Sequence, residues 1–178
     1  MPVSSKTIVI EEVLENIFSY LPDMSFNVNS ETYPVTFGYG DQVELNAFLA
    51  NRDKSTTYPL IWMLYPLDED HQKTMLVATN VTFVLAVTTN QSMENRERIK
   101  LTYGKVLMPL LYNIRTAFKQ SNVLTIQSEN ESFKSIKYPN YSNTESRDES
   151  GTIAIWDALR FSVDLEIIDT CIKPIKFF

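Results

Sequence analysis

The spacing of apolar residues predicts three helices. Between Thr7 and Leu21 apolar residues recur at steps of three and four, the period of an amphipathic helix. A shorter helix is expected from Asp41 to Arg52, where an acidic N-cap residue is followed three positions later by a glutamate, as in a capping box. The longest pattern runs from Glu94 to Lys119, and Pro109 predicts a kink or a break within it.

Other segments follow the patterns of β-strands. Phe26 to Phe37 alternates in two short runs across a turn, which predicts a hairpin, and Met75 to Thr89 and Val123 to Gln127 are rich in strand-forming residues. Leu60 to Tyr65 is unbroken apolar sequence between two prolines, as expected of a central strand covered on both faces. Leu159 to Ile167 alternates strictly between apolar and polar residues, which predicts a strand with one buried face.

These elements predict an α+β fold. With short connections the strands should pair mainly antiparallel, with the helices packed on one face of the sheet. A chain of 178 residues with 44% hydrophobic and 21% charged residues fits one globular domain spanning 1–178. Residues 128–151 are dense in serine, asparagine, glutamate and lysine, so we expect a long, mobile polar excursion there.

The composition argues against several classes of function. Four glycines leave few places for a phosphate-binding loop, and a net charge of −6 opposes binding to nucleic acid. The single cysteine, Cys171, and the single histidine, His71, form neither a disulfide nor a zinc-type motif, so no cofactor or metal is expected. The apolar runs are far shorter than the roughly 20 residues that cross a bilayer, so we expect a protein made in the cytoplasm without membrane contact.

Few residues suggest catalysis. Asp68, Glu69 and Asp70 precede His71 and could in principle hold a cation or a general base. Neighbouring side chains in an extended segment point to opposite faces, which favours a solvated turn instead. Cys171 lies in no cysteine-protease motif, so the sequence predicts that the protein is not an enzyme.

Paired-carboxylate chemistry remains a minority interpretation. Asp164 and Glu166 share one face of the predicted terminal strand, but Arg160 lies on that face too, which favours a solvated or partner-facing surface. Aromatic residues beside the polar excursion are typical interface anchors. The candidate interface residues are therefore Tyr138, Tyr141, Trp156, Arg160, Asp164 and Glu166.

The order and style of these elements resemble tail-terminator or tail-completion proteins of tailed bacteriophages. The resemblance covers most of the chain and rests on the N-terminal helix and on four further segments: Tyr58-Pro59-Leu60-Ile61-Trp62-Met63-Leu64-Tyr65, Val81 to Val87, Val106-Leu107-Met108-Pro109-Leu110-Leu111-Tyr112-Asn113-Ile114, and Trp156-Asp157-Ala158-Leu159-Arg160-Phe161-Ser162-Val163-Asp164-Leu165. The polar stretch from Ser128 to Gly151 departs from the compact pattern of that family.

The resemblance implies a structural virion protein without catalysis. It would form a homo-oligomeric ring, a hexamer or higher, at the tail end or at the neck between head and tail. Its partners would be copies of itself and the tail tube, neck or portal-associated proteins, with no sequence-specific binding to nucleic acid. The alternative from the residues alone is a small cytosolic adaptor or protein-binding module that acts as a monomer or dimer.

Overall fold

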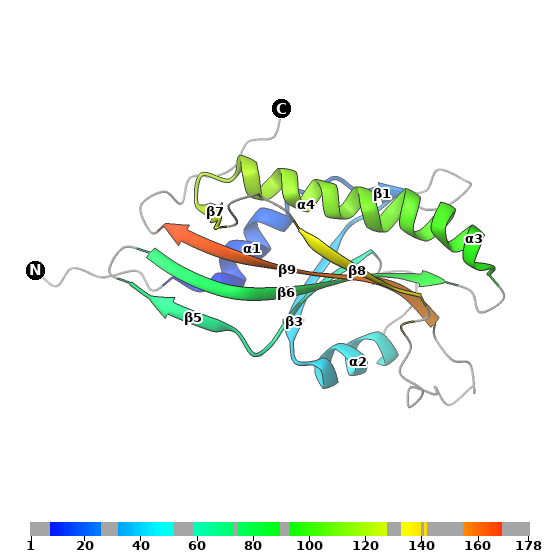
Figure 1. Cartoon of the computed structure of the whole chain (residues 1–178), viewed down its shortest axis with the longest axis horizontal. Helices are drawn as coiled ribbons and strands as arrows, with labels where there is room; N and C mark the ends of the chain where they lie inside the picture. The colour runs from blue at the N-terminus through cyan, green and yellow to red at the C-terminus, as the bar shows by residue number, and fades with distance from the viewer. Residues whose placement is uncertain are drawn as a thin grey trace, which may run out of the picture.

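The computed structural model describes residues 8–25, 32–51, 59–72, 75–89, 93–127, 133–139, 141 and 155–168. Figure 1 shows a central sheet with a long helix along one side and a short helix on the other. The described helices include none that is long and apolar enough to cross a membrane.

Two long antiparallel strands, β6 (Met75–Thr89) and β9 (Ile155–Ile168), form the centre of the sheet. Within the described residues the sheet has seven strands, in the order β3 (Thr36–Gly40), β4 (Leu60–Leu64), β6, β9, β7 (Leu124–Ile126). Beyond this path, β5 (Asp68–His71) pairs with β6 and β8 (Lys134–Tyr138) pairs with β9. β3 and β4 are parallel and the other pairs are antiparallel, which confirms the predicted α+β class and the mainly antiparallel sheet.

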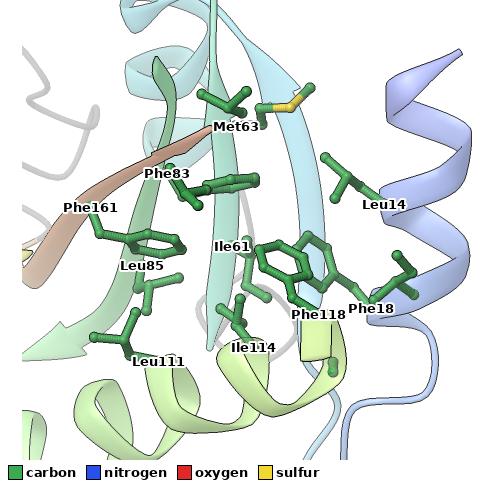
Figure 2. Packing of buried hydrophobic residues seen from close by; sticks show 14 of the residues in the cluster. Leu14, Phe18, Ile61, Met63, Phe83, Leu85, Leu111, Ile114, Phe118 and Phe161 are labelled. Carbon is green, nitrogen blue, oxygen red and sulfur yellow. The ribbon is translucent and has the colours of Figure 1, made fainter. Parts of the chain in front are cut away.

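The face of the sheet that we call the α4 face carries the larger core. It is covered by α1 (Ile10–Phe18) and by one helical stretch made of α3 (Asn95–Arg98), a π-helix η1 (Ile99–Leu107) and α4 (Met108–Gln120). Figure 2 shows the aromatic centre of this core, where the rings of Phe83 and Phe161 stack 5.1 Å apart. Phe18 of α1 and Phe118 of α4 lie 6.1 and 6.2 Å from Phe83. The predicted N-terminal and long helices are confirmed.

Pro109 does not split the long helix, because the helix changes its hydrogen-bond register just before the proline. The nine residues of η1 are π-helical, and Met108 N–H at its end donates to the carbonyl of Tyr103, five residues back. Pro109 therefore enters at the first turn of α4. In the first turn of a helix the backbone N–H groups have no partner within that helix, so a proline there, which lacks an N–H, loses no hydrogen bond and the helix continues.

The opposite face, which we call the α2 face, has its own smaller core beneath α2 (Gln42–Asn51). The predicted capping box is present: Glu44 N–H donates to Asp41 Oδ1 at 2.8 Å, and Asp41 N–H donates to Glu44 Oε2 at 2.8 Å. The expectation that the helices pack on one face holds for α1 and α4 but not for α2. Because β4 is apolar at every position, it needs a cover on both faces, and α2 supplies the second.

Three further segments differ from their predicted form. In the predicted hairpin, β1 (Met24–Ser25) pairs with β2 (Thr32–Tyr33), while Phe26 and Val28 lie outside the described residues. The polar segment around His71, expected as a turn, forms β5 because its backbone pairs with β6. Part of the expected mobile excursion, residues 134–138, forms β8, whose backbone pairs with β9.

Candidate interaction surface

β9 bears out the strict alternation of its sequence. From Leu159 to Ile167 the odd-numbered side chains are buried in the α4 face, and the even-numbered ones point to the α2 face. Before Leu159 the even positions Trp156 and Ala158 are also buried, beneath α2. Arg160 marks the border, because it is exposed and the even positions after it are only half-buried. Among the described residues, the α2 face is therefore covered over one half and open over the other.

We call the uncovered part of this face the open half. Residues that pair directly across antiparallel strands share a face, which extends the surface of β9 onto β6 and β5 on one side and onto β7 and β8 on the other. Among the described residues, the open half consists of Arg160, Ser162, Asp164 and Glu166 from β9, Val77 and Thr79 from β6, Asp68 and Asp70 from β5, Thr125 from β7, and Lys134 and Ile136 from β8. It brings together three of the six candidate interface residues, namely Arg160, Asp164 and Glu166.

A bulge in β6 shapes the middle of the open half. The register shifts between Ala78 and Val81, and Asn80 adopts a φ of 52°, the left-handed region that asparagine tolerates better than most residues. Asn80 N–H, left without a ladder partner, donates to Asp164 Oδ1 at 2.6 Å. Glu166 accepts a hydrogen bond from Gln127 Nε2 at 3.1 Å. The two β9 carboxylates on this face, Asp164 and Glu166, are thus held in place by hydrogen bonds.

The other three candidates belong to the molecule's own second core. Trp156 is fully buried, which corrects the expectation of an aromatic in an exposed loop, because it lies in β9 under α2. Tyr138 and Tyr141 are half-buried against the same core, with their rings 5.5 Å apart. The Tyr141 hydroxyl lies 3.0 Å from Gln42 Oε1 and donates to it, which ties the segment after β8 to α2.

The acidic residues around His71 do not converge. Asp68 and Asp70 lie opposite Thr79 and Val77, on the α2 face, whereas Glu69 and His71 lie opposite residues of the α4 core. His71 Nε2 is 3.2 Å from Glu69 Oε2 at the exposed edge of the sheet. In the described part of the chain, no group of three or more histidine, cysteine, aspartate or glutamate residues could hold a metal ion. Cys171 lies outside the described residues.

A buried ion pair on the α4 face was not predicted from the sequence. Arg98 Nη1 donates to Asp157 Oδ1 at 2.7 Å, and both side chains are almost completely buried. Thr102 Oγ1 lies 2.7 Å from Asp157 Oδ2 and 2.7 Å from the Arg98 carbonyl. The one available signal was Asp157, a charged residue at an inward position of a strand that is otherwise apolar on that face. Its enclosure makes it a structural link between η1 and β9.

Two tyrosines at the margins of the α4 face, Tyr65 and Tyr103, have raised pKa values. Burial and the neighbouring Asp157 carboxylate raise the pKa of Tyr103 above its ordinary value, and its hydroxyl donates to the Ala158 carbonyl at 3.3 Å. Burial and a hydrogen bond to Glu11 raise the pKa of Tyr65 in the same direction. Both hydroxyls act as hydrogen-bond donors that join helices to the sheet.

Comparison with known proteins identifies no family. No protein-family model matches the chain, and no curated protein sequence matches it.

Proposed function

We propose that this chain is a structural virion protein of a tailed phage that forms an oligomeric ring at the tail end or at the neck. It is made in the host cytoplasm and works without catalysis. Its partners are copies of itself and the tail tube, neck or portal-associated proteins. The element order behind the family resemblance supports this, since α1, β4, β6, the long helix and β9 follow one another as that resemblance requires.

The observation that carries the proposal is the open half of the α2 face. An antiparallel sheet can leave a polar face in water, but an uncovered face that mixes apolar and charged side chains is also suited to a partner, and among the described residues α2 covers only part of this face. The uncovered residues include a half-buried apolar side chain, Val77, among exposed and half-buried charged ones. Such a mixture fits a protein interface, where charges set orientation and specificity.

Sedimentation velocity of the purified full-length chain over a range of concentrations tests the proposal. We expect a discrete species of six or more subunits, which electron microscopy should show as a ring. Because some ring proteins assemble only on their target, the same measurement is repeated with the tail-tube and portal-associated proteins encoded beside its gene. A chain that stays monomeric or dimeric in both series would support the adaptor alternative and overturn the proposal.

A further inference from the structure

The exposed side of α4 is unusual for a solvated helix surface. Met108, Tyr112, Arg115 and Lys119 are spaced by four, three and four residues, so they form one stripe along the helix. We call them the outer α4 stripe. Tyr112 is 70% exposed and Met108 is 39% exposed, while the inward stripe of the same helix is buried in the core. Exposed aromatic and methionine side chains of this kind are enriched at protein interfaces.

The outer α4 stripe is also basic. From Lys100 to Lys119 the helix carries four basic residues and no acidic residue, in a chain whose net charge is −6. Arg115 is held in position, with its guanidinium carbon 5.9 Å from the centre of the Phe133 ring. The helix thus presents two large side chains and a positive charge on the same surface.

The open half of the α2 face has the opposite charge. Asp68 and Asp70 of β5 and Asp164 and Glu166 of β9 lie on either side of β6, whose Val77 and Thr79 lie between them. These four carboxylates outnumber the two basic residues of the open half, Arg160 and Lys134. Three strands span about 10 Å from the first axis to the last, which is close to the 10–12 Å diameter of a helix. A helix of opposite charge therefore matches this surface in width and in charge.

The two surfaces lie on opposite faces of one sheet, so they cannot meet within a molecule (Figure 1). We propose that the outer α4 stripe of one copy docks on the open half of the next copy. This inference rests on the proposed self-assembly and assigns its two contact surfaces. Contacts between two different surfaces are heterologous, and they close into a ring when the rotation between neighbours divides a full turn.

Paired charge reversals test this contact by sedimentation. One double variant, Arg115→Glu with Lys119→Glu, makes the outer α4 stripe acidic, and a second, Asp68→Lys with Asp70→Lys, makes part of the open half basic. We expect each double variant to weaken association at least about tenfold, because each places like charges on the two surfaces that meet. A chain that carries all four substitutions should recover association, because the charges are exchanged. Two control variants carry the same changes in charge outside the proposed contact: Arg96→Glu with Lys100→Glu on the same helical stretch, and Glu12→Lys with Glu15→Lys on α1. Both controls should assemble as the wild type does.

Single cysteines identify the two partners directly. In a Cys171→Ser background, Tyr112→Cys and Thr79→Cys are prepared separately, mixed and oxidised. We expect disulfide-linked dimers in the mixture and none in either variant alone, whereas a symmetric contact would link one variant to itself.

The outcomes separate this inference from the proposed function. A wild type that assembles while the charge reversals and the cysteine mixture have no effect overturns the inference and leaves the ring proposal standing. A wild type that never assembles, with or without virion partners, overturns both.

Discussion

The two faces of the sheet differ in how completely they are covered. On the α4 face, α1 and the long helical stretch enclose a continuous apolar core, and the buried pair of Arg98 and Asp157 lies at the end of it. On the α2 face, one ten-residue helix covers one half and leaves acidic residues of β5 and β9 open. The difference suggests two roles: the α4 face holds most of the buried apolar contacts, and the α2 face carries the surface that we propose for a partner.

The largest expected effect is on the aromatic centre of the α4 face. Phe83→Ala removes a ring that contacts Phe18, Phe118 and Phe161, and should lower the free energy of unfolding by about 3–5 kcal/mol. Phe48→Ala is the matched change on the α2 face, where Phe48 is only half-buried beside Trp62. Urea denaturation should show a clearly smaller loss for Phe48→Ala. Equal losses would mean that both faces contribute alike to stability.

The buried ion pair should come next. Asp157→Asn leaves the Arg98 charge buried without its counter-ion and should cost about 3 kcal/mol, the lower end of the range for such changes. Replacing both partners by apolar residues, Arg98→Met with Asp157→Leu, should cost less than the single change. Denaturant titration of the wild type, the single variant and the double variant measures the three free energies of unfolding and checks this order. A double variant less stable than the single one would contradict this account of the pair.

Alkaline pH should weaken the α4 face through Tyr103. The pKa of Tyr103 is raised above its ordinary value of 10.0, so above about pH 10 the folded chain keeps a proton that the unfolded chain loses. This contribution to stability is complete below that pH and falls as the pH rises, by at most about 1.4 kcal/mol per pH unit. Tyr103→Phe should reduce the slope of stability against pH, whereas Tyr112→Phe on the exposed side of α4 should not.

The capping box of α2 can be used to test whether α2 unfolds independently of the core on the α4 face. Asp41→Ala removes the acceptor of the Glu44 N–H bond and should cost about 1 kcal/mol. Hydrogen exchange should become faster mainly in α2, with the long helix on the opposite face unchanged. Faster exchange across both faces would show that the two cores unfold together.

The smallest effect on folding is expected in the open half. Arg160→Ala changes an exposed side chain at its border and should alter the free energy of unfolding by less than about 0.5 kcal/mol. Thermal denaturation measures this, and sedimentation of the same variant measures association. A loss of stability as large as that of Phe48→Ala would show that Arg160 supports the fold rather than a surface for partners.

Much of the fold could be predicted because the strongest patterns arise from burial. Apolar alternation in β9 and the helical period of α4 each reflect contact with the core on the α4 face, and the apolar run of β4 reflects contact with both cores. β5 and β8 could not be predicted, because these edge strands consist mainly of exposed polar residues and are held by backbone pairing with β6 and β9. Backbone pairing leaves little trace in side-chain pattern.

The candidate surface was predicted only in part, for a related reason. Arg160, Asp164 and Glu166 were found because alternation along one strand shows which residues share a face. Asp68 and Asp70 join them only through the β5–β6–β9 pairing, which no local pattern shows. Trp156 was misplaced because the polar residues before it gave no sign that α2, more than a hundred positions earlier, covers it.

The open half cannot form until β6 has paired with β9. More than sixty residues separate the two strands, so their pairing closes a long loop at a cost in chain entropy. Until β9 has been synthesised, β6 keeps one edge unpaired and Asn80 has no Asp164 to accept its N–H. A nascent chain without β9 therefore lacks half of the open surface, and it cannot recruit a neighbour through that surface before its own sheet is complete.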